Sequence, residues 1–387
     1  MGVILPKPIL SKVVDRVGSE IISAGCCCIN GYRNTMEDAH VMDVEKHGRM
    51  VFGVFDGHSN DKCSNYVAEH LRGKLHALPP LFTDAQLEKV CIEIDEQFLE
   101  DVGEGGTTAT FCMVEYDPST NKYSLVIANV GDSRTIVARD GKVAFATTDH
   151  KPSNAEEKAR IERCGGSVRM NRVDGDLAVS RAFGDGPFKR VAANDLRNQK
   201  VIAVPDITRL ALNIGDVIVI ACDGVFEGNF VNEEVVSLVF SELDAKVLDL
   251  GVVSAKVCDM AVRRGSKDNI SCMVVQLQPG VQHAATFGHK SFVPGPPYPK
   301  THEASRTAYA RMAALAGYSL ADALQMRFDL LQSLSRNTMS QLPPIQQLAF
   351  SMSDEIDLES ERIFFGQGPV PGNEKSFFES LANGGGH

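Results

Sequence analysis

The chain has 387 residues, of which 43% are hydrophobic and 23% charged, so it is long enough to bury a large core. Its formal net charge of −11 argues against nucleic acid as the main partner, because a phosphate backbone needs a basic protein face. The sequence shows no signal-peptide pattern and no apolar run long enough to span a membrane. We therefore expect a cytoplasmic protein, with an additional nuclear pool left open.

Residues 1–20 are interpreted as an N-terminal segment that precedes the main domain. Met1-Gly2 opens the chain, but the N-myristoylation pattern needs Ser or Thr where Pro6 stands, so N-terminal acylation stays an open question. The ten cysteines show no CxxC spacing. Together with the missing secretory leader, this indicates reduced, mostly buried thiols and no disulfide framework.

Strand-like runs in residues 21–280 follow one another as hairpins. Residues 123–130, 133–140 and 143–148 are predicted to be consecutive antiparallel strands, joined by tight turns at Gly131-Asp132 and Gly141-Lys142. Parallel strands would need longer crossovers, so this pattern predicts antiparallel sheets.

Helices are predicted between the groups of strands. Capping boxes formed by Thr83 with Gln86 and by Ser153 with Glu156 mark two helix starts, and Gly165 ends the second of these helices. Helical periodicity is present in three more segments, residues 61–78, 232–242 and 252–264. Strands and helices that segregate in this way predict an α+β layered sandwich.

A Pro/Gly-rich connector over residues 281–300 separates this domain from a helical region over residues 301–387. Helices are predicted there at residues 308–317, 320–335 and 344–365, separated by Gly317 and by Pro343-Pro344. The region contains no catalytic constellation. We expect these helices to pack on the main domain, with binding of a regulatory partner as the alternative, and we expect a monomer.

Acidic residues stand at the ends of several strand-like runs. Asp56-Gly57, Asp132 and Asp223-Gly224 each follow an apolar run, and Glu37-Asp38 and Asp268 each precede one. A carboxylate at the end of a buried strand is costly unless a charge compensates it, so these ends are expected to converge on a shared cation. Hard oxygen donors without neighbouring His or Cys ligands favour Mg²⁺ or Mn²⁺.

Upstream of these acids lies Arg33, a residue type suited to bidentate capture of phosphate, within the motif Gly31-Tyr-Arg-Asn-Thr-Met-Glu-Asp-Ala-His40. Further motifs follow in order: Gly106-Thr-Thr-Ala109, Asp149-His-Lys-Pro152, Gly175-Asp-Leu-Ala-Val-Ser-Arg-Ala-Phe-Gly-Asp185, Ala221-Cys-Asp-Gly224 and Ser266-Lys-Asp-Asn-Ile270. With this series across residues 21–278, the chain closely resembles the PP2C family of metal-dependent protein serine/threonine phosphatases.

The resemblance implies a four-layer αββα sandwich, in which two antiparallel sheets are flanked by helices and a two-metal centre lies at one edge. It implies that Asp56 bridges two Mg²⁺ or Mn²⁺ ions and that the Gly57 carbonyl is a further ligand. The remaining acids that match the family's metal positions are Glu37, Asp38, Asp223 and Asp268. Arg33 matches the phosphate-binding residue, and His58 matches the general acid.

The activity that the resemblance implies is hydrolysis of phosphoserine and phosphothreonine in phosphoprotein substrates. Two ions that share a water lower its pKa, and the resulting metal-bridging hydroxide attacks phosphorus directly. Asp132 matches an acid at a third, weaker ion. Glu227 follows Phe226 where many relatives have Trp-Asp, so we also assign it, as a lengthened carboxylate, to that third ion.

The sequence admits two other interpretations. Cys27-x₅-Arg33 formally matches the loop of cysteine-based phosphatases, but IISAGCCCI is strand-like and lacks the helix N-terminus that activates such a thiol, and Cys258-x₅-Arg264 gives the same match by chance. The second is a pseudophosphatase that acts as a phosphoprotein-binding scaffold. It would have lost metal ligands, whereas this chain keeps a carboxylate at every matched position.

His40 and His150 are expected to be hydrogen-bonded residues that organise the cleft rather than metal ligands. The segment after Gly184-Asp185, which in relatives leads into a flap beside the catalytic cleft, has an individual sequence here. Substrate choice is therefore not inferred from it.

Overall fold

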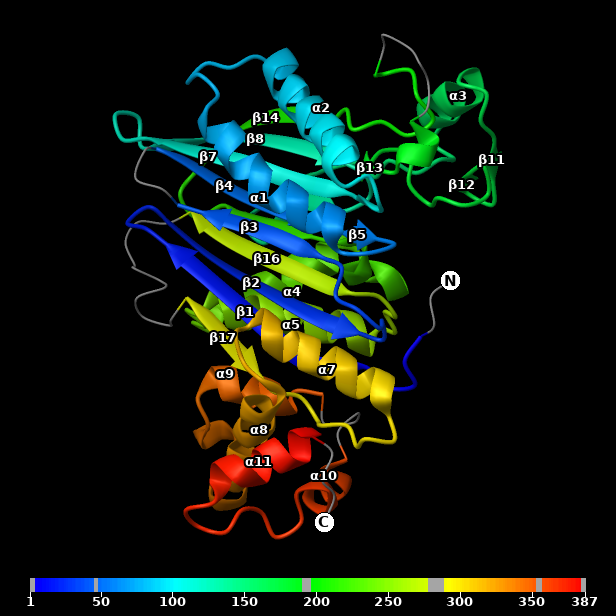
Figure 1. The fold of residues 1–387 in the computed structure, drawn as a ribbon. Coiled ribbons are helices and arrows are strands. Elements are labelled where there is room, and N and C mark those ends of the chain that lie inside the picture. The colour runs from blue at the N-terminus through cyan, green and yellow to red at the C-terminus, as the bar shows by residue number, and fades with distance from the viewer. Residues whose placement is uncertain (1–3, 45–47, 190–195, 278–288, 353–356, 384–387) are drawn as a thin grey trace.

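The computed structural model describes the whole chain except residues 1–3, 45–47, 190–195, 278–288, 353–356 and 384–387, and two antiparallel β-sheets form its centre (Figure 1). The seven-stranded sheet has the order β10-β9-β15-β16-β2-β1-β17. Its strands are β1 (Ile9–Gly18), β2 (Ile22–Gly31), β9 (Arg134–Arg139), β10 (Lys142–Ala146), β15 (Val217–Ala221), β16 (Ile270–Leu277) and β17 (Lys290–Val293).

The five-stranded sheet has the order β14-β8-β7-β4-β3. Its strands are β3 (Ala39–Asp43), β4 (Arg49–Phe55), β7 (Ala109–Asp117), β8 (Lys122–Val130) and β14 (Asp206–Leu212). Two small sheets complete the strands: β13 (Phe183–Gly184), β6 (Gly106–Thr107) and β5 (Gly57–His58) form one, and β11 (Val168–Arg169) and β12 (Arg172–Val173) form the other.

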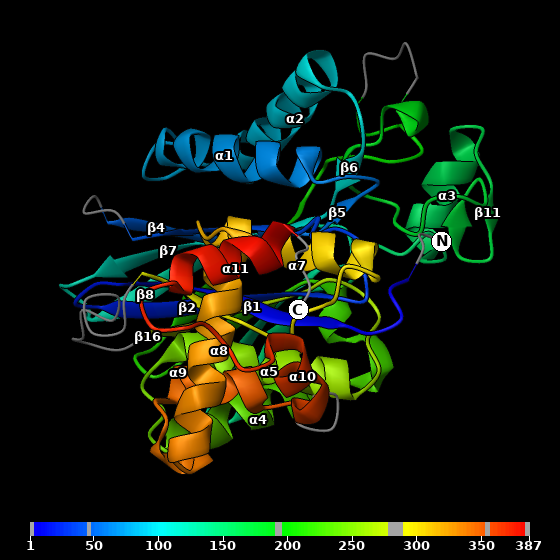
Figure 2. The ribbon, with the colours of Figure 1, turned by 60° about the horizontal axis from the view of Figure 1, so that its bottom comes forward.

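The sheets stack face to face and helices cover both outer faces, which confirms the predicted α+β sandwich (Figures 1 and 2). Helices α1 (Lys62–His76) and α2 (Asp84–Asp101) share an apolar cluster with the five-stranded sheet. Helices α4 (Asn232–Asp244) and α5 (Leu250–Arg263) share another with the seven-stranded sheet. A third apolar cluster lies between the two sheets.

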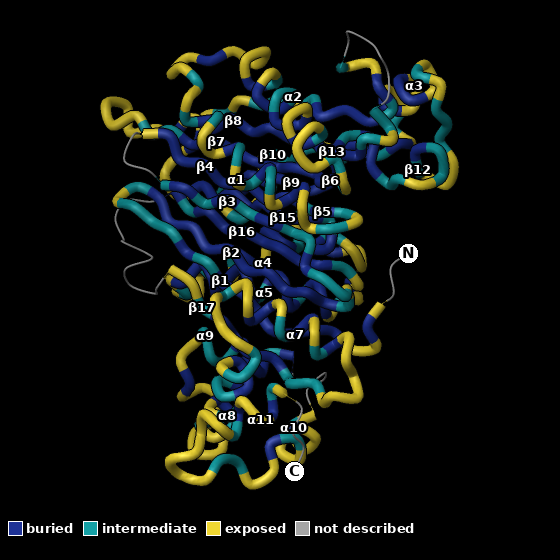
Figure 3. Tube along the Cα trace, viewed as in Figure 1, coloured by how far each residue is buried: buried dark blue, intermediate teal, exposed yellow. Residues whose placement is uncertain are grey.

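Strand β2 is buried along its whole length, because α5 covers one of its faces and the second sheet covers the other (Figure 3). Side chains alternate along a strand, so Cys27 joins the apolar cluster with α5, while Cys26 and Cys28 join the cluster between the sheets. At Gly25 a Cβ would lie 2.2 Å from the Gly251 backbone nitrogen of α5. Only glycine allows this close contact between helix and sheet.

The prediction that β8 and β9 form a hairpin is wrong. Strand β8 pairs with β7 and β14, whereas β9 pairs with β10 and β15 in the other sheet. Gly131, with a φ of 107°, lies where the chain crosses from one sheet to the other. Both strands are largely buried on both faces. Because the chain crosses between the sheets, each strand pairs with a strand on either side and stays in the core. The predicted hairpin of β9 and β10 is present.

The helices within residues 21–280 lie where the sequence places them, with one wrong start. The Thr83 capping box is confirmed, since the Thr83 hydroxyl accepts from the Gln86 backbone N–H at 3.3 Å. Helix α3 (Ala155–Arg163) instead begins after Asn154, and Ser153 provides no side-chain cap. Gly165 follows that helix with a φ of 76°, the left-handed conformation that favours glycine.

The seven-stranded sheet extends beyond residues 21–280 at both ends. Strand β1 lies within the predicted N-terminal segment, and β17 lies within the predicted connector and pairs with β1. Residues 281–288 of that connector lie outside the described residues. The sequence does not predict β1, because Lys12 and Arg16 interrupt its apolar residues. Both are buried in ion pairs, Lys12 with Asp259 at 3.0 Å and Arg16 with Asp249 at 2.7 Å.

The C-terminal helices pack partly on the seven-stranded sheet, partly on the edge of the cluster between the sheets and partly on one another. They are α7 (Glu303–Leu315), α8 (Leu320–Arg336), α9 (Pro344–Gln347), α10 (Leu358–Phe365) and α11 (Glu374–Asn383). The predicted single helix over residues 344–365 is wrong, because it divides into α9, a short 3₁₀ turn and α10, and α11 was not predicted. Partner binding by these helices stays a prediction.

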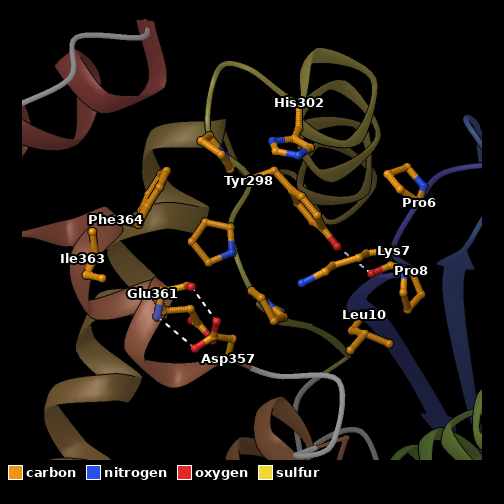
Figure 4. A pocket seen from close by; sticks show the side chains of 14 residues that line it. Pro6, Lys7, Pro8, Leu10, Tyr298, His302, Asp357, Glu361, Ile363 and Phe364 are labelled. Atoms are coloured by element: carbon orange, nitrogen blue, oxygen red, sulfur yellow. Dashed lines mark hydrogen bonds between the residues drawn. The ribbon is translucent and has the colours of Figure 1, made fainter.

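A cavity of about 410 Å³ lies where the N-terminal segment, the predicted connector and α10 meet (Figure 4). Pro6, Tyr298 and Phe364 contribute to its mainly apolar lining, which includes none of the candidate metal ligands. In the part of the chain that the structure describes, no helix combines the length and the apolar character needed to cross a membrane.

A buried ion pair fixes α8 to α10, and its loss should destabilise the C-terminal region. The Arg327 guanidinium is fully buried and donates to both Glu361 oxygens, at 2.7 and 2.8 Å. Glu361→Ala should lower the free energy of unfolding by about 3–5 kcal/mol, because it leaves a buried charge unpaired. Urea denaturation followed by circular dichroism measures this. In the control Glu379→Ala, which removes an exposed pair with Lys375, the change should stay below about 1 kcal/mol. Equal losses in both variants would contradict this role.

Candidate metal centre

The predicted acidic ligands meet at one edge of the sandwich because each stands at a strand end. Asp56 follows β4, Asp132 follows β8 and Asp223 follows β15, while Asp38 precedes β3 and Asp268 precedes β16. Carboxylate oxygens of Asp38 and Asp56 lie within 4.8 Å of one another. Charge repulsion from Asp132 and Asp268 acts on both Asp56 and Asp223, so these acids lie in the same group.

Burial and mutual repulsion favour the protonated forms of these acids. Burial, followed by repulsion from Asp223 and Asp38, raises the pKa of Asp56 well above its usual range. Burial also raises the pKa of Asp38 to about 8, although Ser271 donates a hydrogen bond to its Oδ2 at 2.6 Å. A divalent cation among these oxygens would reverse the effect, because positive charge favours the ionised carboxylate.

The residues present fit such a cation. Asp38 Oδ1 is buried, and no nitrogen or oxygen donor among the described residues reaches it. A buried carboxylate oxygen left in this state is suited to a metal ion. Gly57 is constrained in the same place, since a Cβ there would lie 2.3 Å from the Glu37 carbonyl oxygen. Glu37 itself accepts a hydrogen bond from Thr35 at 2.8 Å.

Cys222 also lies at this centre, within 4.8 Å of the Asp38 and Asp56 oxygens, and was not among the predicted site residues. Burial and the neighbouring acids raise the pKa of its thiol well above the usual range, so it stays protonated. Its sulfur accepts a hydrogen bond from the Ser271 backbone N–H at 3.1 Å. We assign Cys222 to holding β15 and β16 together rather than to binding a hard cation.

Arg33 lies at the open side of the acids. Its Nη2 is 2.5 Å from Asp268 Oδ2, and 45% of its side chain is exposed. Burial lowers the pKa of Arg33, but the carboxylate of Asp268, with smaller contributions from Asp56 and Glu227, gives a net upward shift. A permanently charged guanidinium that is anchored yet accessible can contact an incoming anion.

His58 is paired with Asp185, a residue to which the sequence analysis gave no role. His58 Nε2 lies 2.9 and 2.8 Å from the two Asp185 oxygens. Burial lowers the pKa of His58, but the charge and hydrogen bond of Asp185, together with the charges of Asp132 and Glu37, produce a net upward shift. The shift favours the protonated form of His58, which a proton donor requires.

The small sheet of β5, β6 and β13 explains this pair. Gly106 of β6 lies opposite His58 on one side and opposite Gly184 on the other. A Cβ at Gly106 would lie 2.3 Å from Asp185 Oδ2 and 2.4 Å from His58 Nε2. The sequence does contain Gly106 and Gly184, which make room for the pair of His58 and Asp185. These glycines are far apart in the sequence, and only the strand pairing brings them together.

The residues predicted for a third ion have other partners. Asp132 is buried and forms an ion pair with Lys151. Glu227 is exposed and accepts hydrogen bonds from the Lys267 backbone N–H at 2.9 Å and from the Ser266 hydroxyl at 3.1 Å. Both acids still contribute to the raised pKa of Asp223. Their assignment to a third ion stays a prediction.

The remaining candidate residues lie in the interior or form hydrogen bonds within the fold. Cys27 and Cys258 are fully buried, so neither sulfur is available as a nucleophile. His150 accepts from the Gly131 backbone N–H at 3.1 Å and pairs with Asp206 at 3.2 Å, which fits the organising role expected of it. In the segment after Asp185, residues 190–195 lie outside the described residues.

The family model of protein phosphatase 2C matches residues 22–270. The chain belongs to the protein phosphatase 2C family. It is 34% identical over 301 residues to protein phosphatase 1B of Mus musculus, covering 71% of this chain and 75% of that protein. It is 35% identical over 270 residues to probable protein phosphatase 2C 76 of Arabidopsis thaliana, covering 66% of this chain and 59% of that relative.

Solved structures support the same assignment. A phosphatase from a pathogenic strain of Toxoplasma gondii aligns with a TM-score of 0.65 and 30% identity, covering 73% of this chain and 98% of that one. A sex-determining protein of C. elegans aligns with a TM-score of 0.56 and 26% identity, covering 68% of this chain and 66% of that one. The family consists of protein serine/threonine phosphatases, and this chain carries its fold.

The raised pKa of Asp38 predicts how pH affects the metal-free protein. The pKa of the Asp38 carboxyl is about 3.9 in the unfolded chain and about 8 in the folded protein. Protonation of Asp38 therefore stabilises the folded state fully below about pH 3.9, and this stabilisation is lost as the pH rises through about 8. In EDTA at pH 8.5, the melting temperature of Asp38→Asn should therefore exceed that of wild type by at least about 2–4 °C. At pH 5 the difference in melting temperature should be much smaller. Differential scanning calorimetry tests this. A gap independent of pH would contradict the raised pKa.

The His58 pair gives a second prediction. Asp185→Asn removes a charge that raises the pKa of His58, so this pKa should fall. NMR titration of the His58 ring protons measures the midpoint directly. Asp101→Asn, which changes an exposed acid bonded to Tyr66, serves as the control and should leave that midpoint in place. An unchanged midpoint in Asp185→Asn would show that another group controls His58.

Proposed function

We propose that the chain is a Mg²⁺- or Mn²⁺-dependent protein serine/threonine phosphatase that hydrolyses phosphoserine and phosphothreonine by direct attack of water, without a covalent intermediate. One observation carries the proposal: buried acids whose pKa values are raised meet at one edge of the sandwich. Among them, Asp38 Oδ1 has no nitrogen or oxygen hydrogen-bond donor in the described part of the chain. Phosphoproteins are the proposed substrates, on the strength of family membership.

Asp38, Asp56, Asp223 and Asp268, with Glu37 and the Gly57 carbonyl, would hold two divalent cations. When bound, such cations lower the pKa of a shared water and supply a nucleophile at neutral pH. Since Asp56 sits between β4 and β5, and its neighbours come from both sheets, the scaffold fixes the carboxylates before a cation arrives.

The chain's own residues then act on the phosphate. Arg33, exposed on one side, neutralises the non-bridging oxygens. Asp185 holds His58 through Nε2, so the proton given to the leaving serine or threonine oxygen comes from Nδ1. Proton donation matters because an alkoxide is a poor leaving group.

Hydrolysis of a phosphothreonine peptide tests the proposal. Turnover should require added Mg²⁺ or Mn²⁺ and stop in excess EDTA. Asp56→Asn and Asp223→Asn should each lower kcat/KM at least about 100-fold while the protein stays folded. Asp244→Asn, at an exposed position near the end of α4, is the matched control and should keep full turnover.

Two results would overturn the proposal. Full turnover in EDTA would exclude a role for bound cations. Metal-dependent binding of the phosphopeptide without hydrolysis would instead identify a pseudophosphatase that acts as a phosphoprotein-binding scaffold.

A further inference from the structure

We propose that Cys26, Cys28 and His40 form a second cation site, selective for thiophilic ions of the Zn²⁺ type and separate from the carboxylate centre. The two sulfur atoms and a ring nitrogen of His40 lie within 4.8 Å of one another. Cys28 Sγ is 3.7 Å from His40 Nδ1. Ligand atoms around a tetrahedral Zn²⁺ are roughly 3.5–4 Å apart, so small movements would place these three ligands around the ion, with a water molecule as the fourth ligand.

Strand geometry brings these ligands together. Cys26 and Cys28 are two residues apart on β2, so both side chains point to the same face, toward the five-stranded sheet. His40, which the sequence alone predicts to be a hydrogen-bonded residue rather than a ligand, comes from β3, the edge strand of that second sheet. The three ligands thus bridge the two sheets, and the side chain of His40, 20% exposed, provides the approach from solvent.

A carboxylate orients the histidine in the way that zinc sites require. Asp15 Oδ2 lies 3.1 Å from His40 Nε2, which leaves Nδ1 directed at the sulfur of Cys28. Asp15 stands opposite Cys26 in the pairing of β1 with β2. A carboxylate that holds the second ring nitrogen fixes the tautomer and strengthens the ligand.

The ligand chemistry selects a soft cation. Each thiol loses its proton to solvent as its sulfur binds, so two thiolates and one Zn²⁺ form a neutral group that is inexpensive to bury. Mg²⁺ and Mn²⁺ prefer oxygen ligands and would stay at the acids. A disulfide is the poorer alternative, because Cα atoms two residues apart on a strand are about 6.7 Å apart, near the upper limit for such a bond.

This site contacts the candidate catalytic centre through one residue. The Ser271 hydroxyl donates to Asp38 Oδ2 at 2.6 Å and lies 3.3 Å from Cys28 Sγ. A hydroxyl has a single proton, and a metal-bound thiolate competes for it better than a thiol does. An ion at Cys26, Cys28 and His40 should therefore weaken the hydrogen bond from the Ser271 hydroxyl to Asp38. This part of the inference rests on the proposed phosphatase function.

Cobalt spectroscopy of the full chain tests the binding claim. Co²⁺ is titrated in excess Mg²⁺, which occupies the carboxylates, and thiolate ligation is read from the sulfur-to-cobalt charge-transfer band. We expect one Co²⁺ per chain with this band, and its loss in Cys26→Ala and in Cys28→Ala. Cys27→Ala, on the opposite face of the same strand, should keep it. A folded wild type without the band, or a band that survives both Cys26→Ala and Cys28→Ala, would overturn the proposal.

A second variant keeps the test decisive if a cysteine variant does not fold. Asp15→Asn retains both thiols and should weaken Co²⁺ affinity about 10–100-fold, as loss of an orienting carboxylate does. Unchanged affinity in that folded variant would contradict the site.

The effect on catalysis is measured separately. In excess Mg²⁺, Zn²⁺ should inhibit phosphopeptide hydrolysis by wild type at lower concentration than it inhibits Cys26→Ala. Equal inhibition would remove the link through Ser271. If no variant hydrolyses the peptide, the proposed function fails, while the cobalt band still decides whether the site exists.

Discussion

Mutual repulsion among the carboxylates of the candidate metal centre is the constraint on which the rest of the structure depends. Asp38, Asp56 and Asp223 approach one another in surroundings that favour their neutral forms. Such an arrangement persists only if the scaffold forces it, because free side chains would separate into water. Two stacked sheets provide that force, since each acid is fixed at the end of a strand whose interior is buried.

The crossings between the sheets matter as much as the sheets themselves. Asp132 lies at the point where the chain passes from β8 to β9, and Asp38 lies just before β3 joins the second sheet. Acids contributed by both sheets can meet only at the edge where these passages occur. The small sheet of β5, β6 and β13 adds the pair of His58 and Asp185 to the same region. The fold therefore brings the residues of the proposed reaction together at one edge of the sandwich.

Much of this could be predicted because it depends on local sequence. Apolar runs that end in Asp-Gly indicate strand ends, and the Thr83 capping box indicates a helix start. The failures concern long-range information. The apparent hairpin at Gly131 is a crossing between sheets, and β1 could not be predicted because Lys12 and Arg16 are buried with partners more than 200 residues away. Asp185 and Cys28 acquire their partners, His58 and His40, only through strand pairing and sheet stacking.

Anomalous diffraction from crystals grown with Mn²⁺ tests the central claim most directly, because it locates ions without reference to activity. The account predicts two neighbouring manganese peaks at the edge of the sandwich, with an Asp56 oxygen in contact with both. Manganese bound elsewhere on the surface, or a cluster of acids that stays without manganese at saturating concentration, would contradict it.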